Sequence, residues 1–410
     1  MKKKIFIDVI LNMLSTFIPM FALQFIILPQ VALKINADMY GQLIAIMAFV
    51  YLASASFGSV LNNSKLIHYK KYEELKIKGD FNILLLIFIV ANLFIMTAGL
   101  LFYGESFNIL TSISIIIIST ILLYTTYASV EFRIKLNFIS ILVNSIFLFL
   151  GYLIGFGLFI LTGYWTLIYI FGFGFNLIHI IKKTNIFSEK LTKTPLFKIT
   201  AKESLLLLFS GIIVSLGAYL DKLIIFPILG GSAVAIYYAA TILGKTIALA
   251  IGPITSVFLS YLAHMKKFSS NNFKFLLSLS FIFGFLGYWV VILTSKPLLT
   301  LIYPQYVTEA IQYIPITTIS IMITIISNII NPILLKFSGA KWQIAINGIF
   351  MLIYIPLSIY LLSIYGLMGL CIGILIANVV KLIILIATYS FINRTTKDNN
   401  LSEEYINVSN

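Results

Sequence analysis

Charged side chains are scarce in this chain, because Asp, Glu, Lys and Arg together make up 10% of the 410 residues. Soluble domains carry about 25% charged residues, so the chain has too little polar surface to cover a water-soluble globule. Cysteine is rarer still: Cys371 is the single one, and no intramolecular disulfide can form. The three histidines, His68, His179 and His264, have no metal-ligand spacing. These shortages exclude a soluble globular fold, a disulfide scaffold and a histidine metal site.

Apolar residues, by contrast, make up 60% of the chain, and the mean hydropathy is +1.04. A membrane-spanning helix needs about 20 consecutive apolar residues. The sequence therefore predicts an all-α polytopic membrane protein, and it excludes a disordered chain and a nucleic-acid-binding domain. Twelve segments are apolar enough to span a bilayer: 5–33, 39–61, 81–102, 107–130, 138–161, 164–181, 204–229, 233–262, 275–295, 310–335, 342–363 and 367–392.

Lysine and arginine are distributed unevenly between alternate loops. With the N-terminus on the cytoplasmic side, 23 of the 28 basic residues fall in inner segments, and Lys34 and Lys296 fall in outer loops. Because cytoplasmic loops are enriched in Lys and Arg, this alternation predicts twelve helices with both termini in the cytoplasm. The net charge of +14 then follows from topology and needs no nucleic-acid partner. The first span is expected to be a retained signal anchor, since its apolar run is longer than that of a cleaved signal.

The longest inner loop lies midway along the chain and separates six predicted spans from the next six. An even number of spans in each half makes the halves parallel repeats about an axis along the membrane normal. The sequence therefore predicts four regions: an N-terminal six-helix bundle at 1–181, a cytoplasmic linker at 182–203, a C-terminal six-helix bundle at 204–392 and a cytoplasmic tail at 393–410.

Each half has a proline near the outer end of its first helix. These are Pro29 and Pro227, within similar stretches 198 residues apart. Proline removes a backbone hydrogen bond and bends a helix, and interrupted helices at corresponding places point to a transporter site. Two interpretations stay open: the prolines are hinges, or they only end their helices at the outer interface.

Charged residues occur inside the apolar spans at five positions: Asp8, Asp221, Lys222, Lys245 and Lys381. A charge in the bilayer costs about 2.5–3.5 kcal/mol on insertion scales, so such residues usually face a cavity or a partner. Helical periodicity groups them with small and polar residues, and one stripe holds Ser204, Gly211, Ser215 and Lys222.

We expect Lys222, Lys245 and Lys381 to line a water-filled cationic cavity that suits a phosphate or diphosphate group. The uncharged polar residues expected to line the same cavity are Gln24, Ser215, Tyr238 and Thr241. The alternative is a purely structural network, in which Asp221 neutralises a lysine and fixes helix contacts. Neighbouring residues point about 100° apart on a helix, so Asp221 is not expected simply to cancel Lys222. Asp221 and Asp8 are the candidates for a coupling proton or a charge partner.

The loops are too short for a catalytic domain, since the longest outer loop is 296–309. Gly244-Lys245-Thr246 is similar to the end of a phosphate-binding loop, but the glycine required five residues earlier is Ala239. The sequence therefore predicts a transporter and not an enzyme, with no cofactor and no metal. Its driving force would be an ion gradient or the gradient of the substrate itself.

Several short stretches carry a family resemblance. Tyr219-Leu220-Asp221-Lys222-Leu223 is followed by Gly230-Gly231 and by Ile236-Tyr237-Tyr238-Ala239-Ala240; Tyr40-Gly41, Ser56-Phe57-Gly58 and Gly366-Leu367-Met368-Gly369 are the others. With these residues the chain resembles the bacterial polysaccharide flippases of the O-antigen translocase type, in the multidrug/oligosaccharidyl-lipid/polysaccharide exporter superfamily. Ala235 stands where that family usually has glycine.

The resemblance implies two six-helix bundles around a central cavity that opens alternately to either side. It implies a flippase that moves an undecaprenyl-diphosphate-linked oligosaccharide repeat unit across the bacterial cytoplasmic (inner) membrane, for O-antigen or capsule assembly. Its partners would be that lipid-linked glycan, membrane lipid and a polysaccharide polymerase, and the flippase would be a monomer.

Two other functions stay open. One is an ion-coupled multidrug exporter of the same superfamily. Such exporters usually bind cations and place acidic groups in the cavity, whereas three lysines stand against two aspartates in the spans of this chain. The other is a membrane-bound polysaccharide polymerase or glycosyltransferase, which usually has large outer loops.

Overall fold

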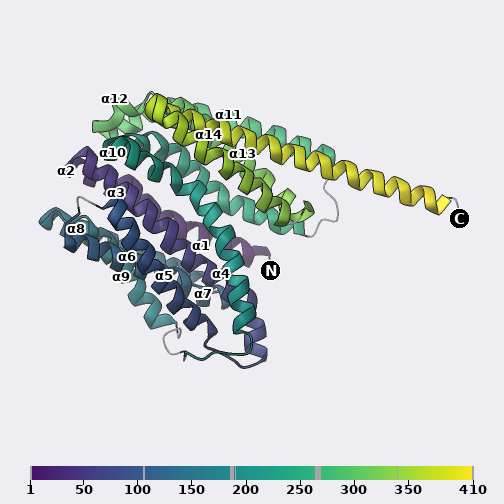
Figure 1. The fold of residues 1–410 in the computed structure, drawn as a ribbon, viewed down its shortest axis with the longest axis horizontal. Coiled ribbons are helices and arrows are strands. Elements are labelled where there is room, and N and C mark those ends of the chain that lie inside the picture. Colours follow the sequence, from purple (N-terminus) through teal and green to yellow (C-terminus); the bar gives the residue numbers. More distant parts are fainter. Residues whose placement is uncertain are drawn as a thin grey trace. The chain divides into compact units, whose positions relative to one another are not determined.

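The protein, described here from a computed structural model, is built from helices connected by short turns (Figure 1). The structure describes residues 2–104, 107–184, 189, 191–263, 269–338 and 340–408. Within these ranges, nine helices are long and apolar enough to cross a membrane. The expected all-α membrane fold is confirmed, whereas twelve spans and cytoplasmic termini stay predictions. Several residues used in the sequence argument lie outside the described ranges: Lys190, His264, Lys266 and Lys267.

The chain divides into two compact units, Met1–Ala235 and Ile236–Asn410, which we call the N-terminal and C-terminal units. The N-terminal unit extends beyond the linker expected at 182–203 and takes in the segment 204–229, which the sequence repeats place in the second half. The helices, in chain order, are α1 (Lys2–Phe21), α2 (Leu28–Lys34), α3 (Ala37–Val50), α4 (Ser56–Glu74), α5 (Asp80–Tyr103), α6 (Ile109–Ala128), α7 (Val130–Ile134), α8 (Phe138–Thr162), α9 (Thr166–Lys183), α10 (Phe197–Ala263), α11 (Ser270–Ile302), α12 (Val307–Ala310), α13 (Ile314–Ser338) and α14 (Ala340–Val408).

Asparagine side chains mark where several helices begin. Asn36, Asn108 and Asn137 stand immediately before α3, α6 and α8, and each accepts a hydrogen bond from a backbone N–H three residues on, at 2.7, 2.8 and 3.0 Å. An N-cap of this kind satisfies one of the free N–H groups at a helix start. Local sequence therefore sets these boundaries, close to those expected from the apolar runs.

Two helices are interrupted by a glycine in the left-handed region. Gly230 has φ 80° inside α10, and Gly366 has φ 60° inside α14. Glycine reaches positive φ without a Cβ clash, so the chain turns at these points and each long helix comprises two segments. Both glycines fall in the gaps that the sequence predicts between consecutive spans, at 230–232 and 364–366.

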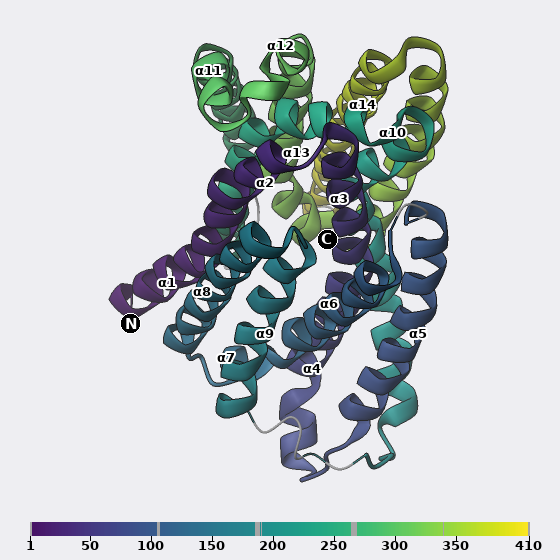
Figure 2. The same cartoon turned by 90° about the vertical axis from the view of Figure 1, so that its left-hand side faces the viewer.

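Within the N-terminal unit, α8 packs along α9, and α1 packs along α8 (Figure 2). The backbones of α8 and α9 approach closely at Gly151. A Cβ added there would lie 2.3 Å from the carbonyl oxygen of Phe171, so a larger side chain would not fit. Small residues allow helices in a membrane to approach in this way. A second core joins α4, α5 and α6 through buried side chains that include Phe57, Leu61, Phe88 and Tyr127.

Within the C-terminal unit, α13 packs along α14 and α11 packs along α13. Their buried core includes Ile330, Ile333 and Leu385, and Phe273 stacks on Tyr389 with ring centroids 3.6 Å apart. Cys371 is buried in this unit and is not part of a disulfide.

Candidate functional site

Asp221 and Lys222 form a buried ion pair in the first segment of α10. Their exposed fractions are 5% and 7%, and Lys222 Nζ lies 3.4 Å from Asp221 Oδ1. The backbone N–H of Lys222 also donates a hydrogen bond of 2.9 Å to this oxygen. The sequence argument expected these neighbours to diverge, but the long lysine side chain folds back along the helix and reaches the carboxylate. The two charges therefore stabilise each other directly.

The ammonium of Lys222 lies over the ring of Tyr219 as well, 5.8 Å from its centroid. Tyr219 in turn stacks on Tyr51, with centroids 5.9 Å apart and ring planes 17° apart. An aromatic ring attracts a cation through its quadrupole and leaves the cation charged. Lys222 thus contacts one carboxylate and one tyrosine ring of its own helix, α10.

The polar stripe predicted on this segment exists, and three of its members contact α4. Ser204 Oγ is 2.8 Å from Ser64 Oγ, and Ser56 Oγ donates a hydrogen bond of 2.7 Å to Ser215 Oγ. Between them, a Cβ added at Gly211 would lie 3.3 Å from Val60 Cγ2. The structure therefore joins Ser215 to a neighbouring helix, and a cavity-lining role for Ser215 stays a prediction.

A contact between the Gly230 turn and the start of α3 was not anticipated from the sequence. The backbone N–H of Gly231 donates a hydrogen bond of 2.8 Å to Asp38 Oδ1. The backbones meet closely here, because a Cβ added at Gly41 would lie 1.7 Å from the carbonyl oxygen of Gly231. The adjacent glycines at 230 and 231 were the available signal, since paired glycines often mark a close backbone approach.

Two short π-helical segments, Ala22–Ile27 and Tyr51–Ala55, widen otherwise continuous helices. Gln24 lies half-buried in the first segment, and Pro29 follows it as a buried residue. A proline at this position has no N–H to donate and its ring crowds the preceding turn, which explains the wider helix before it. Single π turns inside α-helices often occur at functional sites.

The other two predicted site residues that lie in the N-terminal unit, Pro227 and Asp8, are placed differently. Pro227 is exposed and stands three residues before the turn at Gly230, so it lies close to a helix end. Asp8 is half-buried on α1. The structure does not bring Asp8 into the Asp221–Lys222 pair, where Lys222 bonds to Asp221.

Tyr238, Thr241 and Lys245 lie on the second segment of α10, in the C-terminal unit. Tyr238 packs edge-on against Tyr303, with centroids 6.2 Å apart. The Thr241 hydroxyl donates to the carbonyl oxygen of Tyr237 at 2.9 Å, and Lys245 Nζ lies 5.5 Å from the centroid of the Tyr237 ring. Outside the spans, burial raises the pKa of Tyr306 to about 12, so this neighbour of Tyr303 stays uncharged.

Lys381 lies half-buried on the second segment of α14. Its Nζ is 4.8 Å from the centroid of the buried Phe350 ring. On the same face, the Asn378 side chain donates a hydrogen bond of 2.9 Å to Ser320 Oγ on α13. Polar contacts of this kind hold helices together in a membrane.

The three intramembrane lysines share one arrangement: each ammonium lies over an aromatic ring, of Tyr219, Tyr237 or Phe350. Tyr219 stands three residues before Lys222, a spacing that places both on one helix face, so this ring could have been predicted. Phe350 belongs to a different helical segment from Lys381, and no local pattern indicates that contact. Among the described residues, no group of three or more His, Cys, Asp or Glu is arranged to hold a metal ion.

No protein-family model matches the sequence, and no curated protein matches it either. Several solved structures are similar to this chain. The lipid II flippase MurJ in an inward closed conformation is 15% identical, with a TM-score of 0.72 over 93% of this chain and 87% of that one. An inward-facing multidrug resistance MATE family transporter of the MOP superfamily is 12% identical, with a TM-score of 0.71 over 94% of this chain and 99% of that one.

A further MATE structure, in the straight conformation, is 13% identical, with a TM-score of 0.65 over 97% of both chains. The chain has the fold of these transporters. At such low identity the likeness establishes the architecture and no finer relationship, so the polysaccharide-flippase branch stays a proposal. The fold implied by the resemblance seen in the sequence is confirmed.

Proposed function

We propose that the protein is a flippase for undecaprenyl-diphosphate-linked oligosaccharide repeat units. It would carry them across the bacterial cytoplasmic membrane by alternating access, through twelve spans with both termini in the cytoplasm. The fold supports this because it is shared with a protein that flips lipid II. The expected role is transport and not catalysis, and the exported glycan would supply O-antigen or capsule assembly.

The observation that carries the proposal is the state of the three intramembrane lysines. The three ammonium groups lie over the rings of Tyr219, Tyr237 and Phe350, and a cation–π contact attracts an ammonium without neutralising it. Lys222 is also paired with Asp221 at 3.4 Å. The apolar spans of the chain together hold three lysines and two aspartates, Asp8 and Asp221. The balance is positive, and a passing diphosphate would gain charge-assisted hydrogen bonds from lysine ammonium groups.

A multidrug exporter is the second candidate, and the match to a MATE family transporter favours it. Exporters of organic cations need acidic groups at the binding site, whereas Asp221 is already paired with Lys222 at 3.4 Å. This pairing favours an anionic transported substrate. A polysaccharide polymerase would need catalytic groups in its outer loops, and those loops are short.

Complementation of a flippase-null strain tests the proposal. Lys222, Lys245 and Lys381 are each changed to Glu and to Arg, and surface polysaccharide is measured at matched membrane levels. We expect the glutamate variants to lose export, since reversal repels the diphosphate, and the arginine variants to keep much of it. Lys135→Glu is the control, because Lys135 is an exposed residue with 59% of its side chain accessible.

Two results would contradict the proposal. Normal export by all three glutamate variants would show that the charges are structural. Failure of the unaltered protein to restore any polysaccharide, together with increased resistance to cationic drugs, would favour the exporter. The strain should therefore be scored for drug susceptibility in the same experiment.

A further inference from the structure

The first segment of α10 contacts α4 and the π-helical segment Tyr51–Ala55 that precedes α4. Four contacts run antiparallel between them. They join Ser204 to Ser64, Gly211 to Val60, Ser215 to Ser56 and Tyr219 to Tyr51. A fifth contact, between Gly231 and Gly41, lies just beyond the Gly230 turn. Residue numbers decrease along one partner as they increase along α10, so the two segments run antiparallel. We call this row of contacts, from Ser204 to Tyr219, the seam. A seam of hydroxyl pairs and close glycines is typical of helices that remain together in a membrane.

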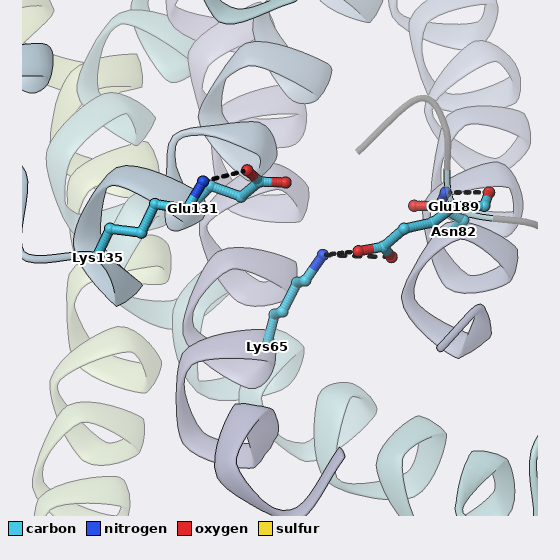
Figure 3. A network of polar contacts seen from close by, with 5 residues as sticks. All are labelled: Lys65, Asn82, Glu131, Lys135 and Glu189. Carbon is cyan, nitrogen blue, oxygen red and sulfur yellow. Dashed lines mark hydrogen bonds and ion pairs between the residues drawn. The ribbon is translucent and has the colours of Figure 1, made fainter. Parts of the chain in front are cut away.

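The chain that leads into this segment is also attached to the inner end of the same unit. Lys65 Nζ lies 3.3 Å from Glu189 Oε1, and Asn82 Nδ2 donates 3.0 Å to the Glu189 carbonyl oxygen (Figure 3). The Lys65 side chain is 11% exposed. A largely buried pair of this kind is costly to break from one side, because the remaining charge is left buried without its partner.

Asp80 adds a second attachment point, since it is completely buried. Its carboxylate accepts hydrogen bonds from the backbone N–H of Thr194 at 2.8 Å and from the Tyr72 hydroxyl at 2.7 Å. The Thr194 hydroxyl donates to it as well, and Tyr72 also contacts Thr200 Oγ1 at 2.8 Å. We call residues 189 and 191–196, which lead into α10, the strap. A buried carboxylate depends on these donors, because an unsatisfied one would be strongly unfavourable.

From these contacts we infer that the strap and the segment 197–229 move with the N-terminal unit as one rigid body. The linker between the sequence repeats, 182–203, is then not the hinge of the transport movement. The hinge is the glycine turn that begins at Gly230, where φ is positive and the N-terminal unit ends five residues later at Ala235. The mechanical boundary lies one helix later than the repeat boundary. This inference rests on the fold and on these contacts, and it holds whichever passenger is carried.

Disulfide locks test this directly, because Cys371 is the single native cysteine and Cys371→Ala gives a clean background. Two double variants place cysteines across the seam: Val60→Cys with Gly211→Cys, and Ser64→Cys with Ser204→Cys. The Ser64 and Ser204 oxygens are 2.8 Å apart, which approaches the sulfur–sulfur bond of about 2.05 Å. We expect both disulfides to form readily in membranes, and export to be equal before and after oxidation.

Loss of export on oxidation, restored by reductant, would overturn the inference, because the first segment of α10 would then have to leave α4 during transport. Such a result would leave the proposed flippase function intact, since the reduced protein would still export. The single-cysteine variants, oxidised in parallel, report any effect of the oxidant alone.

Hydrogen exchange supplies a readout that needs no transport. The Thr194 amide donates to a buried carboxylate, so we expect it to exchange as slowly as the amides of α5, and to accelerate in Lys65→Gln. The matched control is Lys135→Gln, which breaks the exposed pair with Glu131 at 3.4 Å (Figure 3) and should leave Thr194 unaffected. Fast exchange at Thr194 in the unaltered protein would overturn the inference even if the flippase function proved wrong.

Discussion

Gly231 and Asp38 are 193 positions apart in the sequence, yet the backbone N–H of Gly231 donates a hydrogen bond of 2.8 Å to Asp38 Oδ1. The bond fixes the turn at Gly230 against the start of α3. The turn is thus both a point of attachment and the place where the chain changes direction.

Replacing Gly231 by alanine should lower the melting temperature of the purified protein. The new Cβ would lie 2.0 Å from the Asp38 carbonyl oxygen, and overpacking of this kind costs about 1–3 kcal/mol. Gly157→Ala is the matched control, because nothing lies within 4 Å of a Cβ added there and alanine is favoured over glycine inside a helix by about 0.5–1 kcal/mol. Equal melting temperatures for the two variants would contradict the close contact.

Neutralising one member of the Asp221–Lys222 pair should destabilise the protein more than neutralising both. Asp221→Asn or Lys222→Gln leaves a buried charge alone, at a cost of about 3–5 kcal/mol, whereas removing both charges is often close to neutral. The exposed pair Glu131–Lys135, at 3.4 Å, is the control and should contribute about 0.2–1 kcal/mol. Thermal unfolding in detergent measures all of these; additive losses in the double variant would show that the pair does not interact.

The two prolines should differ in effect. Pro29→Ala should slow transport, because restoring the N–H lets the π-helical segment Ala22–Ile27 return to a regular helix and stiffens α1. Pro227→Ala should change little, since that proline is exposed beside the existing turn. Export is compared at matched protein level. Equal slowing by both variants would favour the interpretation that both are hinges.

The predicted topology can be tested with reporter fusions. Alkaline phosphatase fused after residue 410 should be inactive and a fluorescent protein there should fluoresce, because both termini are expected in the cytoplasm. Phosphatase fused within the outer loop 296–309 should be active and serves as the control. Phosphatase activity at the C-terminal fusion would contradict an even number of spans.

The positions of the helices could be predicted because apolar runs, asparagine caps and glycine turns are local signals. Asn36, Asn108 and Asn137 cap helices close to the expected starts, and Gly230 and Gly366 turn the chain in expected gaps. The polar stripe on α10 was also predicted from periodicity alone. Its orientation was not, because periodicity shows that Ser204, Gly211 and Ser215 share a face without showing which helix that face contacts.

Other features depend on contacts between distant parts of the chain. The strap binds Asp80 through Thr194, 114 positions away, and no pattern within either segment indicates the partner. The folding back of Lys222 onto Asp221 depends on a side-chain conformation, which helix geometry alone leaves open. The π-helical segment Tyr51–Ala55 contains no proline, so no local pattern predicted it.

The seam between α4 and the first segment of α10 also determines how this chain could be recombined with a homologue. Ser56 and Ser64 form hydrogen-bonded pairs with Ser215 and Ser204, and the two segments are separated in the sequence by five other helices and the strap. A chimera joined at the midpoint linker would take one side of the seam from each parent and leave the hydroxyl pairs mismatched. A crossover placed at the glycine turn after residue 229 would keep both sides from one parent, so that a different C-terminal half could be grafted onto an intact N-terminal body.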